Sequence, residues 1–207
     1  MTAERRIVLG VSGASGMPLA RAVLAAFAEV PGLEVHLVIS RKAEMVLREE
    51  SAMTAEELSS LAAMTYDADS TGACPASGSW PCDGMIVCPC SMSTLASIAS
   101  GAGQNLIHRA ADVTLKERRP LVLVARETPF NRIHLRNMLA VSEAGAIVMP
   151  FMPAFYCGSM DMNILMRNFA GRLLDQLRIP HDLCLRWDGP REGSRARVPG
   201  AGRVPAR

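Results

Sequence analysis

Hydrophobic and polar residues follow two patterns along this chain, short apolar runs and longer segments with helical spacing. The apolar runs predict buried strands at 7–11, 33–39, 84–88, 121–125 and 146–149. The segments between them predict helices at 19–27, 42–50, 54–58, 95–100, 106–118, 132–144 and 161–177. Apolar strands that alternate with helices are typical of a parallel sheet covered on both faces. The sequence therefore predicts a three-layer α/β/α, doubly wound fold of the Rossmann or flavodoxin type.

Two segments lie outside this pattern. Residues 66–81 show no periodicity and are rich in Asp, Ser, Gly and Pro, so we expect a loop that wraps a ligand or a neighbouring subunit. Residues 189–207 hold five arginines and one glutamate among many Gly and Pro residues, and we expect a solvated, disordered tail. The sequence thus predicts one domain over 1–188, followed by this tail.

The charge balance limits the classes of partner. The formal net charge of the 207 residues is +2, and because the tail is basic the rest of the chain is slightly acidic. Nucleic-acid binders carry a basic patch, so we expect no nucleic-acid partner. No apolar run has the length of a signal peptide core or a membrane span, and we expect a cytoplasmic protein without membrane contact.

The first strand runs into a turn of glycines and serines that leads to the first helix. Gly10, Gly13 and Gly16 permit a tight turn and the close approach of an anion, and the free N–H groups of a helix start favour negative charge. A site for NAD places an acidic residue after the second strand, but here a serine and two cations follow, at 40–42. They favour the phosphate of a mononucleotide such as FMN; NADP and a turn without ligand are the alternatives.

Polar residues follow the other strands as well. In this chain the strand ends carry hydroxyls, cations, an acid and a phenol, in the segments 12–15, 40–41, 91–94, 126–127 and 150–156. Ligands of doubly wound sheets bind at the carboxyl ends of the strands. The sequence therefore predicts, at one edge of the sheet, a site for a phosphorylated ligand with proton chemistry beside it.

Three cations on helices allow two interpretations. Arg109 and Lys116 share a helix face, about 10 Å apart along the axis, with Asp112 between them. They either pair with Asp112 on a solvated surface or bind a ligand phosphate. Arg172, at the edge of the apolar stripe of the last helix, either extends to solvent or meets an anion.

The cysteines show no spacing typical of a metal site, and we expect no metal. Reduced, partly buried thiols are the expectation for all six. A catalytic thiol at Cys88 or Cys90 is an alternative, although no histidine base lies near either in the sequence.

Five segments together resemble the UbiX flavin prenyltransferases. They are 12–16 (SGASG), 88–95 (CPCSMSTL), 109–117 (RAADVTLKE), 121–127 (LVLVARE) and 154–156 (AFY). The similarity extends from about residue 6 to 187, and segments 134–139 and 149–156 are similar to members associated with hydroxyarylic acid decarboxylases.

The resemblance implies an enzyme that joins the dimethylallyl group of dimethylallyl phosphate to N5 and C6 of reduced FMN. The prenylated FMN would then serve a UbiD-type decarboxylase, and the reaction would need no metal. The resemblance also implies a homo-oligomer, a dodecamer, with its sites at subunit interfaces.

The family's functional residues can be carried over position by position. Its FMN contacts fall on Gly13, Ala14, Ser15, Ser40, Ser91, Met92, Ser93, Thr94 and Arg126. Its dimethylallyl phosphate contacts fall on Arg109, Lys116, Glu127, Tyr156 and Arg172. The candidates for catalysis are Ser15 as a proton relay, Glu50 beside the flavin, Lys116 at the departing phosphate, and Glu127 as acid or base.

Two other functions stay open. Residues 162–166 (MNILM) are similar to a signature of flavin-dependent cysteine decarboxylases, which share the fold, but the proline before it and the aromatic residue after it are missing. We interpret this segment as core helix. The alternatives to a prenyltransferase are therefore a flavin-dependent decarboxylase and a non-catalytic FMN-binding accessory subunit of a decarboxylase complex.

Overall fold

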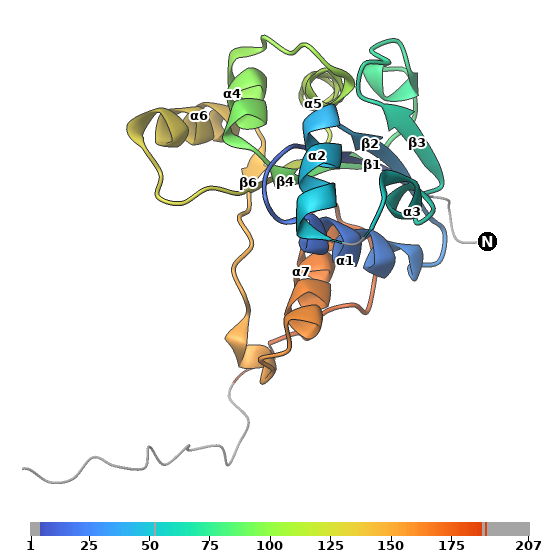
Figure 1. The fold of residues 1–207 in the computed structure, drawn as a ribbon, viewed down its shortest axis with the longest axis vertical. Helices are drawn as coiled ribbons and strands as arrows, with labels where there is room; N and C mark the ends of the chain where they lie inside the picture. Colours follow the sequence, from blue (N-terminus) through green and yellow to red (C-terminus); the bar gives the residue numbers. More distant parts are fainter. Residues whose placement is uncertain (1–4, 52, 188, 190–207) are drawn as a thin grey trace, which may run out of the picture.

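Six parallel strands form the centre of the structure, a computed structural model that describes residues 5–51, 53–187 and 189 (Figure 1). The strands are β1 (Arg5–Val11), β2 (Leu33–Ile39), β3 (Met64–Asp67), β4 (Gly84–Cys90), β5 (Leu121–Ala125) and β6 (Ile147–Val148). Their order is β3-β2-β1-β4-β5-β6, so the chain reverses its direction across the sheet between β1 and β4. This order confirms the predicted doubly wound fold, in which ligands bind where the direction reverses. The tail predicted at 189–207 lies outside the described residues, apart from Gly189.

Helices cover both faces of this sheet. They are α1 (Met17–Ala28), α2 (Arg41–Glu50), α3 (Ala55–Ser59), α4 (Met92–Ser100), α5 (Leu106–Lys116), α6 (Arg132–Glu143) and α7 (Met162–Gln176), with short 3-10 turns η1 (Cys74–Ala76) and η2 (Phe155–Cys157). Figure 1 shows α1 and α7 on one side of the sheet and α4, α5 and α6 on the other. The buried side chains of α2 and α3 belong to the α1 side.

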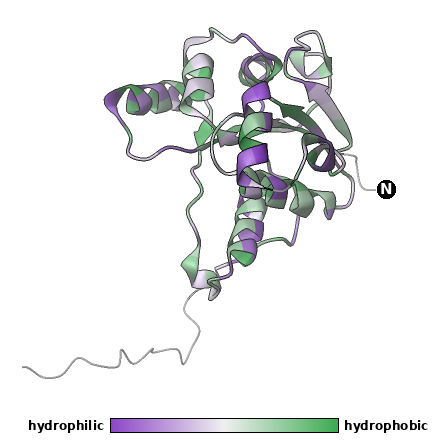
Figure 2. Ribbon diagram, in the orientation of Figure 1, coloured by the Kyte–Doolittle hydropathy of each residue, from purple (hydrophilic) through white to green (hydrophobic). Residues whose placement is uncertain are grey.

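The central strands β1, β4 and β5 are buried on both faces over most of their length, which is why their sequences are nearly continuous apolar runs. Successive residues of β1 alternate between the two cores: Ile7 and Leu9 pack with α1 and α7, whereas Val8 packs with α5. Figure 2 shows the central strands in green, the colour of hydrophobic residues. Burial on two faces supplies the main driving force for this fold.

Side-chain caps set the start of most helices. Ser40, Ser91, Asn105, Asn131 and Asp161 each accept a hydrogen bond from an N–H in the first turn of the helix that follows. Such caps satisfy N–H groups that have no partner inside the helix. Helix α1 differs, because Gly16 stands at its N-cap without a side chain.

The edge strand β3 contradicts part of the sequence prediction. Tyr66 and Asp67 were predicted to begin a loop, but they pair with Val38 and Ile39 of β2. Three of the four β3 residues are exposed, so this strand lacks the apolar pattern that marks the others. Trp80, later in the segment, packs on the sheet. The centroid of its ring lies 4.8 Å from that of the His36 ring in β2, in an edge-on arrangement.

The Ser12 hydroxyl connects the two strands at the reversal. It is 1% exposed, it donates to the carbonyl of Pro89, and it accepts from the N–H of Ser91, both at 2.8 Å. Ser12 was expected among the hydroxyls that bind the ligand. In the structure both of these hydrogen bonds are made with backbone groups of the protein.

Replacing Ser12 by Ala is expected to lower the free energy of unfolding by about 1–3 kcal/mol, because it leaves the buried N–H of Ser91 without a partner. Thermal unfolding should then occur at least roughly 2–4 °C lower. Ser100→Ala, which removes an exposed hydroxyl bonded only to its own helix, is the control. Equal unfolding temperatures for the two variants would contradict this role of Ser12.

Candidate functional site at the carboxyl ends of the strands

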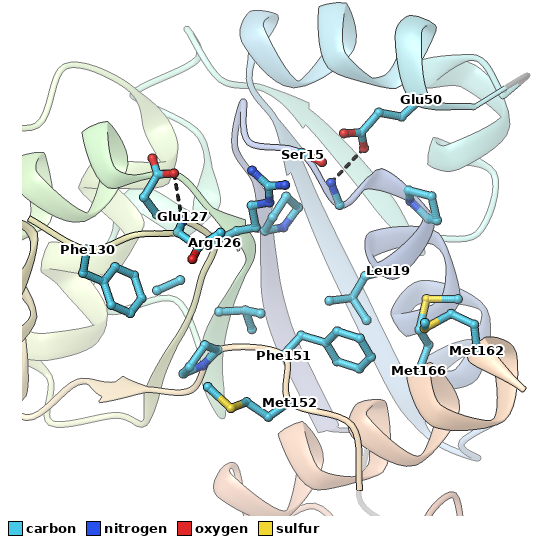
Figure 3. A pocket seen from close by; sticks show the side chains of 17 residues that line it. Ser15, Leu19, Glu50, Arg126, Glu127, Phe130, Phe151, Met152, Met162 and Met166 are labelled. Atoms are coloured by element: carbon cyan, nitrogen blue, oxygen red, sulfur yellow. Dashed lines mark hydrogen bonds between the residues drawn. The ribbon is translucent and has the colours of Figure 1, made fainter. Parts of the chain in front are cut away.

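A pocket of about 690 Å³ opens at the carboxyl ends of β1, β4 and β5 (Figure 3). Its polar side chains are Ser15, Glu50, Arg126, Glu127 and Thr128. Its apolar side chains include Leu19, Phe130, Phe151, Met152, Met162 and Met166. The volume is in the range of small-molecule sites, and broad apolar walls with a few polar groups suit a planar organic ligand.

The Glu50 carboxylate provides the cap that α1 lacks. Its Oε2 accepts hydrogen bonds from the N–H groups of Gly16, at 2.8 Å, and Met17, at 2.9 Å. A carboxylate at a helix N-terminus is stabilised by the helix dipole. In other doubly wound folds a ligand phosphate occupies this place. Here Glu50 fills it, so a ligand phosphate needs other partners.

Several groups keep Glu50 ionised. Partial burial alone raises the pKa of its carboxyl, but hydrogen bonds from the Ser15 hydroxyl and from the Met17 and Gly16 N–H groups, with the charge of Arg126, outweigh burial. The pKa of Glu50 is therefore lowered. Ser15 and Glu50 both border the pocket.

Each of the three glycines around the first turn is required for a different structural reason. A Cβ on Gly13 would lie 2.4 Å from the Cβ of Lys42, so only glycine lets the turn pack on the start of α2. Gly16 has a φ of 121°, which side chains rarely adopt. Gly10 lies inside β1, where an added Cβ would be 3.0 Å from Ile107 of α5. Because Gly13 packs closely on α2, Ser40 at the end of β2 lies beside the end of β1.

Hydroxyls gather at the starts of α2 and α4. Ser40 accepts from the N–H of Ala43 at 3.1 Å, and Ser91 accepts from the N–H of Thr94 at 3.2 Å. Ser91 also donates to the Thr94 hydroxyl at 3.1 Å. Each serine acts as a helix cap and keeps further hydrogen-bonding capacity. The segment Ser91–Thr94, with Met92 and Ser93, lies in the first turn of α4 rather than before the helix, which the sequence predicted to start at 95.

Arg126 and Glu127 follow β5 and border the same pocket. The Arg126 N–H donates to the Cys90 carbonyl at 3.0 Å, which holds this segment against the end of β4. A Glu127 carboxylate oxygen accepts from the Thr128 N–H at 3.0 Å, and its side chain is exposed. Within one chain the structure thus brings together Ser15, Glu50, Arg126 and Glu127.

The other predicted cations lie away from this pocket. Arg109 pairs with Asp112 at 2.7 Å, and Lys116 pairs with Glu117. The ion pair of Arg109 with Asp112, which the surface interpretation expected, is therefore observed. Lys116 pairs with Glu117 rather than with Asp112. Helix α5 runs antiparallel to the strands, so Lys116 at its end lies near the amino ends of the strands, opposite the pocket.

Tyr156 and Arg172 also have partners outside the pocket. Tyr156, in η2, is 54% exposed and its ring meets the Trp187 ring edge-on at 5.9 Å. Arg172 pairs with Asp175, as does Arg186 at 2.7 Å. Arg172 therefore meets a protein carboxylate in this chain.

Asp175 is part of a cluster that the sequence analysis missed. Asp175, His181 and Cys184 place three potential metal-ligand atoms within 4.8 Å of one another. Burial alone raises the pKa of Asp175, but the two arginines and a hydrogen bond from His181, at 3.1 Å, lower it overall. The other ring nitrogen of His181 accepts from the Leu183 N–H. The Asp175 and His181 atoms are thus engaged by protein partners, and their contacts with each other and with Arg186 connect the end of the described chain to α7.

The alternative of a catalytic thiol at Cys88 or Cys90 is not supported. Both side chains are 0% exposed. Burial raises the pKa of both thiols, that of Cys90 to about 12, so neither is a thiolate at neutral pH.

The prediction that residues 162–166 form a core helix was correct only in part. They begin α7, and Leu165 and Met166 are buried, but Met162 is 52% exposed and lines the pocket together with Met166. Phe130, which follows β5, is a further wall residue that the sequence analysis did not single out. A wall formed by separate segments leaves no periodic signal in a sequence.

Comparison with known proteins identifies the family. A family model described as Flavoprotein matches residues 1–169. A probable UbiX-like flavin prenyltransferase of Streptomyces sp. (strain D7) is 44% identical over 186 residues, 90% of this chain and 93% of the relative. This chain belongs to the UbiX-like flavin prenyltransferases.

Solved structures of UbiX-like proteins have the same fold. The crystal structure of AnUbiX in complex with FMN and dimethylallyl pyrophosphate superposes with a TM-score of 0.86, at 45% identity over 90% of this chain and 98% of that one. A dodecameric FMN-dependent UbiX-like decarboxylase from Escherichia coli O157:H7 gives 0.84, at 43% identity over 89% of this chain and 100% of that one. The pocket of the present chain combines apolar walls with a polar edge.

Replacing Glu50 by Gln is expected to lower the free energy of unfolding at pH 7 by about 1–2 kcal/mol, because the neutral amide loses the charge that stabilises the start of α1. Folding lowers the pKa of Glu50, so its contribution is present above the unfolded pKa, about 4.3, and disappears as the pH falls through the folded value. Urea unfolding at pH 7 and pH 3 measures this.

The difference between wild type and Glu50→Gln should therefore be large at pH 7 and small at pH 3. Glu49→Gln, at an exposed neighbouring position, is the matched control and should show little difference at either pH. A difference for Glu50→Gln that stays constant with pH would contradict the cap.

Proposed function

We propose that this protein joins the dimethylallyl group of dimethylallyl phosphate to N5 and C6 of reduced FMN and releases phosphate. When bound, reduced FMN supplies the nucleophilic ring atoms and the donor supplies the allylic carbon. The observation that carries this proposal is the pocket at the reversal of the sheet, where apolar walls meet Ser15, Glu50, Arg126 and Glu127. The prenyl donor and flavin named for the related AnUbiX complex are consistent with it.

The FMN phosphate is assigned to the starts of α2 and α4. Glu50 already occupies the N–H groups at the start of α1, which leaves the hydroxyls of Ser40, Ser91 and Thr94 and the amides around them. These two helices begin after β2 and β4, on either side of β1, and a helix N-terminus favours an anion. Gly13 packs on the start of α2 and Ala14 follows it in the same turn, while Met92 and Ser93 belong to the first turn of α4.

The acid–base roles follow from the charges in the pocket. Glu50 is ionised and accepts from Ser15, so the pair Ser15–Glu50 can take up or pass a proton at the Ser15 hydroxyl. Arg126 places a fixed positive charge beside this pair. Glu127, exposed and without a cationic partner among the described residues, is the candidate base for the C6 proton.

Neighbouring copies of the chain would supply the groups that bind the donor phosphate. Arg109, Lys116, Tyr156 and Arg172 do not line the pocket of their own chain. Several large apolar side chains are exposed on α6 and between β6 and α7, namely Ile133, Leu135, Leu139, Met152, Phe155 and Met160. Such surfaces are typical of contacts between subunits. We therefore propose a homo-oligomer, a dodecamer as named for the related E. coli protein, in which cations from other copies stabilise the departing phosphate.

The product would pass to a UbiD-type decarboxylase, which we propose as the protein partner. No helix within the described residues combines the length and the apolar character of a membrane span. We propose a cytoplasmic location.

A decarboxylase is the second candidate function, because solved relatives at 43% and 40% identity carry that description. It would release CO2 from an acid substrate in the absence of any partner. Cysteine is not available as a nucleophile in the pocket, since Cys88 and Cys90 are fully buried. The prenyltransferase is favoured by the family of the closely similar relatives.

Anaerobic incubation of the protein with reduced FMN and dimethylallyl phosphate should yield a flavin that is heavier by one C5 prenyl unit, as measured by mass spectrometry. Glu127→Gln should slow product formation by at least about 100-fold while FMN stays bound, because the amide cannot accept the proton. Glu143→Gln, at an exposed position of α6, should retain activity.

Unmodified flavin under confirmed anaerobic conditions would contradict the prenyltransferase function. Unchanged turnover of Glu127→Gln would contradict only its role as acid or base.

A further inference from the structure

A second cavity lies at the amino ends of the strands, opposite the flavin pocket. Its volume is about 690 Å³, and four arginines line it: Arg5, Arg118, Arg119 and Arg178. Arg5 begins β1. Pro120, next to Arg119, accepts a hydrogen bond at its carbonyl from the N–H of Met85 in β4. We call it the arginine cavity.

Two of these arginines have a costly backbone conformation. Arg118 and Arg178 both have a φ of 55° and are the two non-glycine residues with positive φ in the described part of the chain. Each follows the end of a helix, α5 or α7, at a position where glycine is usual. A left-handed conformation at a residue with a side chain is strained, and strain of this kind is concentrated at functional sites.

Capping the helices does not require the arginine side chains. The N–H of Arg119 bonds to the Thr114 carbonyl and the N–H of Ile179 bonds to the Leu174 carbonyl, which closes each helix end by backbone groups alone. A cation elsewhere in the last turn would meet the helix dipole without strain. Helix capping therefore does not explain why an arginine follows both α5 and α7.

The arginine cavity has an excess of positive charge. Its acidic residue, Asp83, already pairs with Arg5 at 2.7 Å and accepts from the Arg6 N–H at 2.7 Å. Within the described residues Arg118 and Arg178 form no ion pair, and both are exposed. Arg119 is held in place by the carbonyls of Gly78 and Trp80. The lining also includes the apolar side chains of Leu115, Ile147 and Leu177.

We propose that the arginine cavity binds a small polyanion that carries two phosphate groups. Guanidinium groups bind phosphate oxygens in pairs, and a cluster of them from separate segments suits more than one phosphate. The cavity has room for a small organic group against these apolar side chains besides the phosphates. Within one chain the site is separate from the flavin pocket, because their lining residues do not overlap.

The test is calorimetric titration of the FMN-saturated protein with pyrophosphate, comparing wild type with the double variant Arg118→Gly/Arg178→Gly. Glycine adopts the left-handed conformation without strain, so the double variant should fold and unfold at a temperature no lower than the wild type. Its affinity for pyrophosphate should be at least about tenfold weaker. Arg21→Ala, on α1, is the control and should bind as the wild type does.

Orthophosphate should bind the wild type more weakly than pyrophosphate, and bound FMN should remain in place throughout. Equal pyrophosphate affinity in wild type and double variant would overturn the proposal, as would displacement of FMN by pyrophosphate. Binding of an oligoglutamate peptide at this cavity, with no binding of pyrophosphate, would overturn the small-molecule assignment in favour of a protein surface.

Discussion

The carboxylate of Glu50 at the start of α1 is the interaction on which the site depends. It joins the end of α2 to the turn after β1 through two backbone N–H groups. The same carboxylate lies within the field of Arg126, which helps to lower its pKa. One interaction thus closes the turn and provides an ionised group at the pocket.

This interaction also changes how the fold handles a phosphate. A doubly wound sheet normally offers the first helix N-terminus to the ligand. With that place taken, the starts of α2 and α4 remain, and both begin with a serine cap. The flavin ring can then lie across the carboxyl ends of β1, β4 and β5, against apolar walls that come from α1, α7 and the loop after β6.

The sequence was sufficient for the parts of the structure that local patterns encode. Buried strands such as β4 and β5 are apolar throughout, and the motifs around Ser15, Ser91 and Arg126 follow strands, so their place at one edge could be predicted. The exposed edge strand β3 carries no such pattern. Glu50 and Gly16 are 34 residues apart in the sequence, and their contact depends on packing at Gly13. Neither feature produces a periodic pattern in the sequence. Helix spacing placed Arg109 and Lys116 on one face, but only the direction of α5 shows that its end points away from its own pocket.

The central claim is that one chain holds the flavin half of the site and other copies hold the phosphate half. Mixing two inactive variants, Glu127→Gln and Lys116→Ala, in one oligomer tests it most directly. If Lys116 acts in the pocket of another copy, some sites in the mixed oligomer combine an intact Glu127 with an intact Lys116, and random mixing should restore roughly a quarter of the wild-type prenylation rate. A mixed oligomer as inactive as either variant alone would contradict the claim, because it would mean that both residues act within one chain.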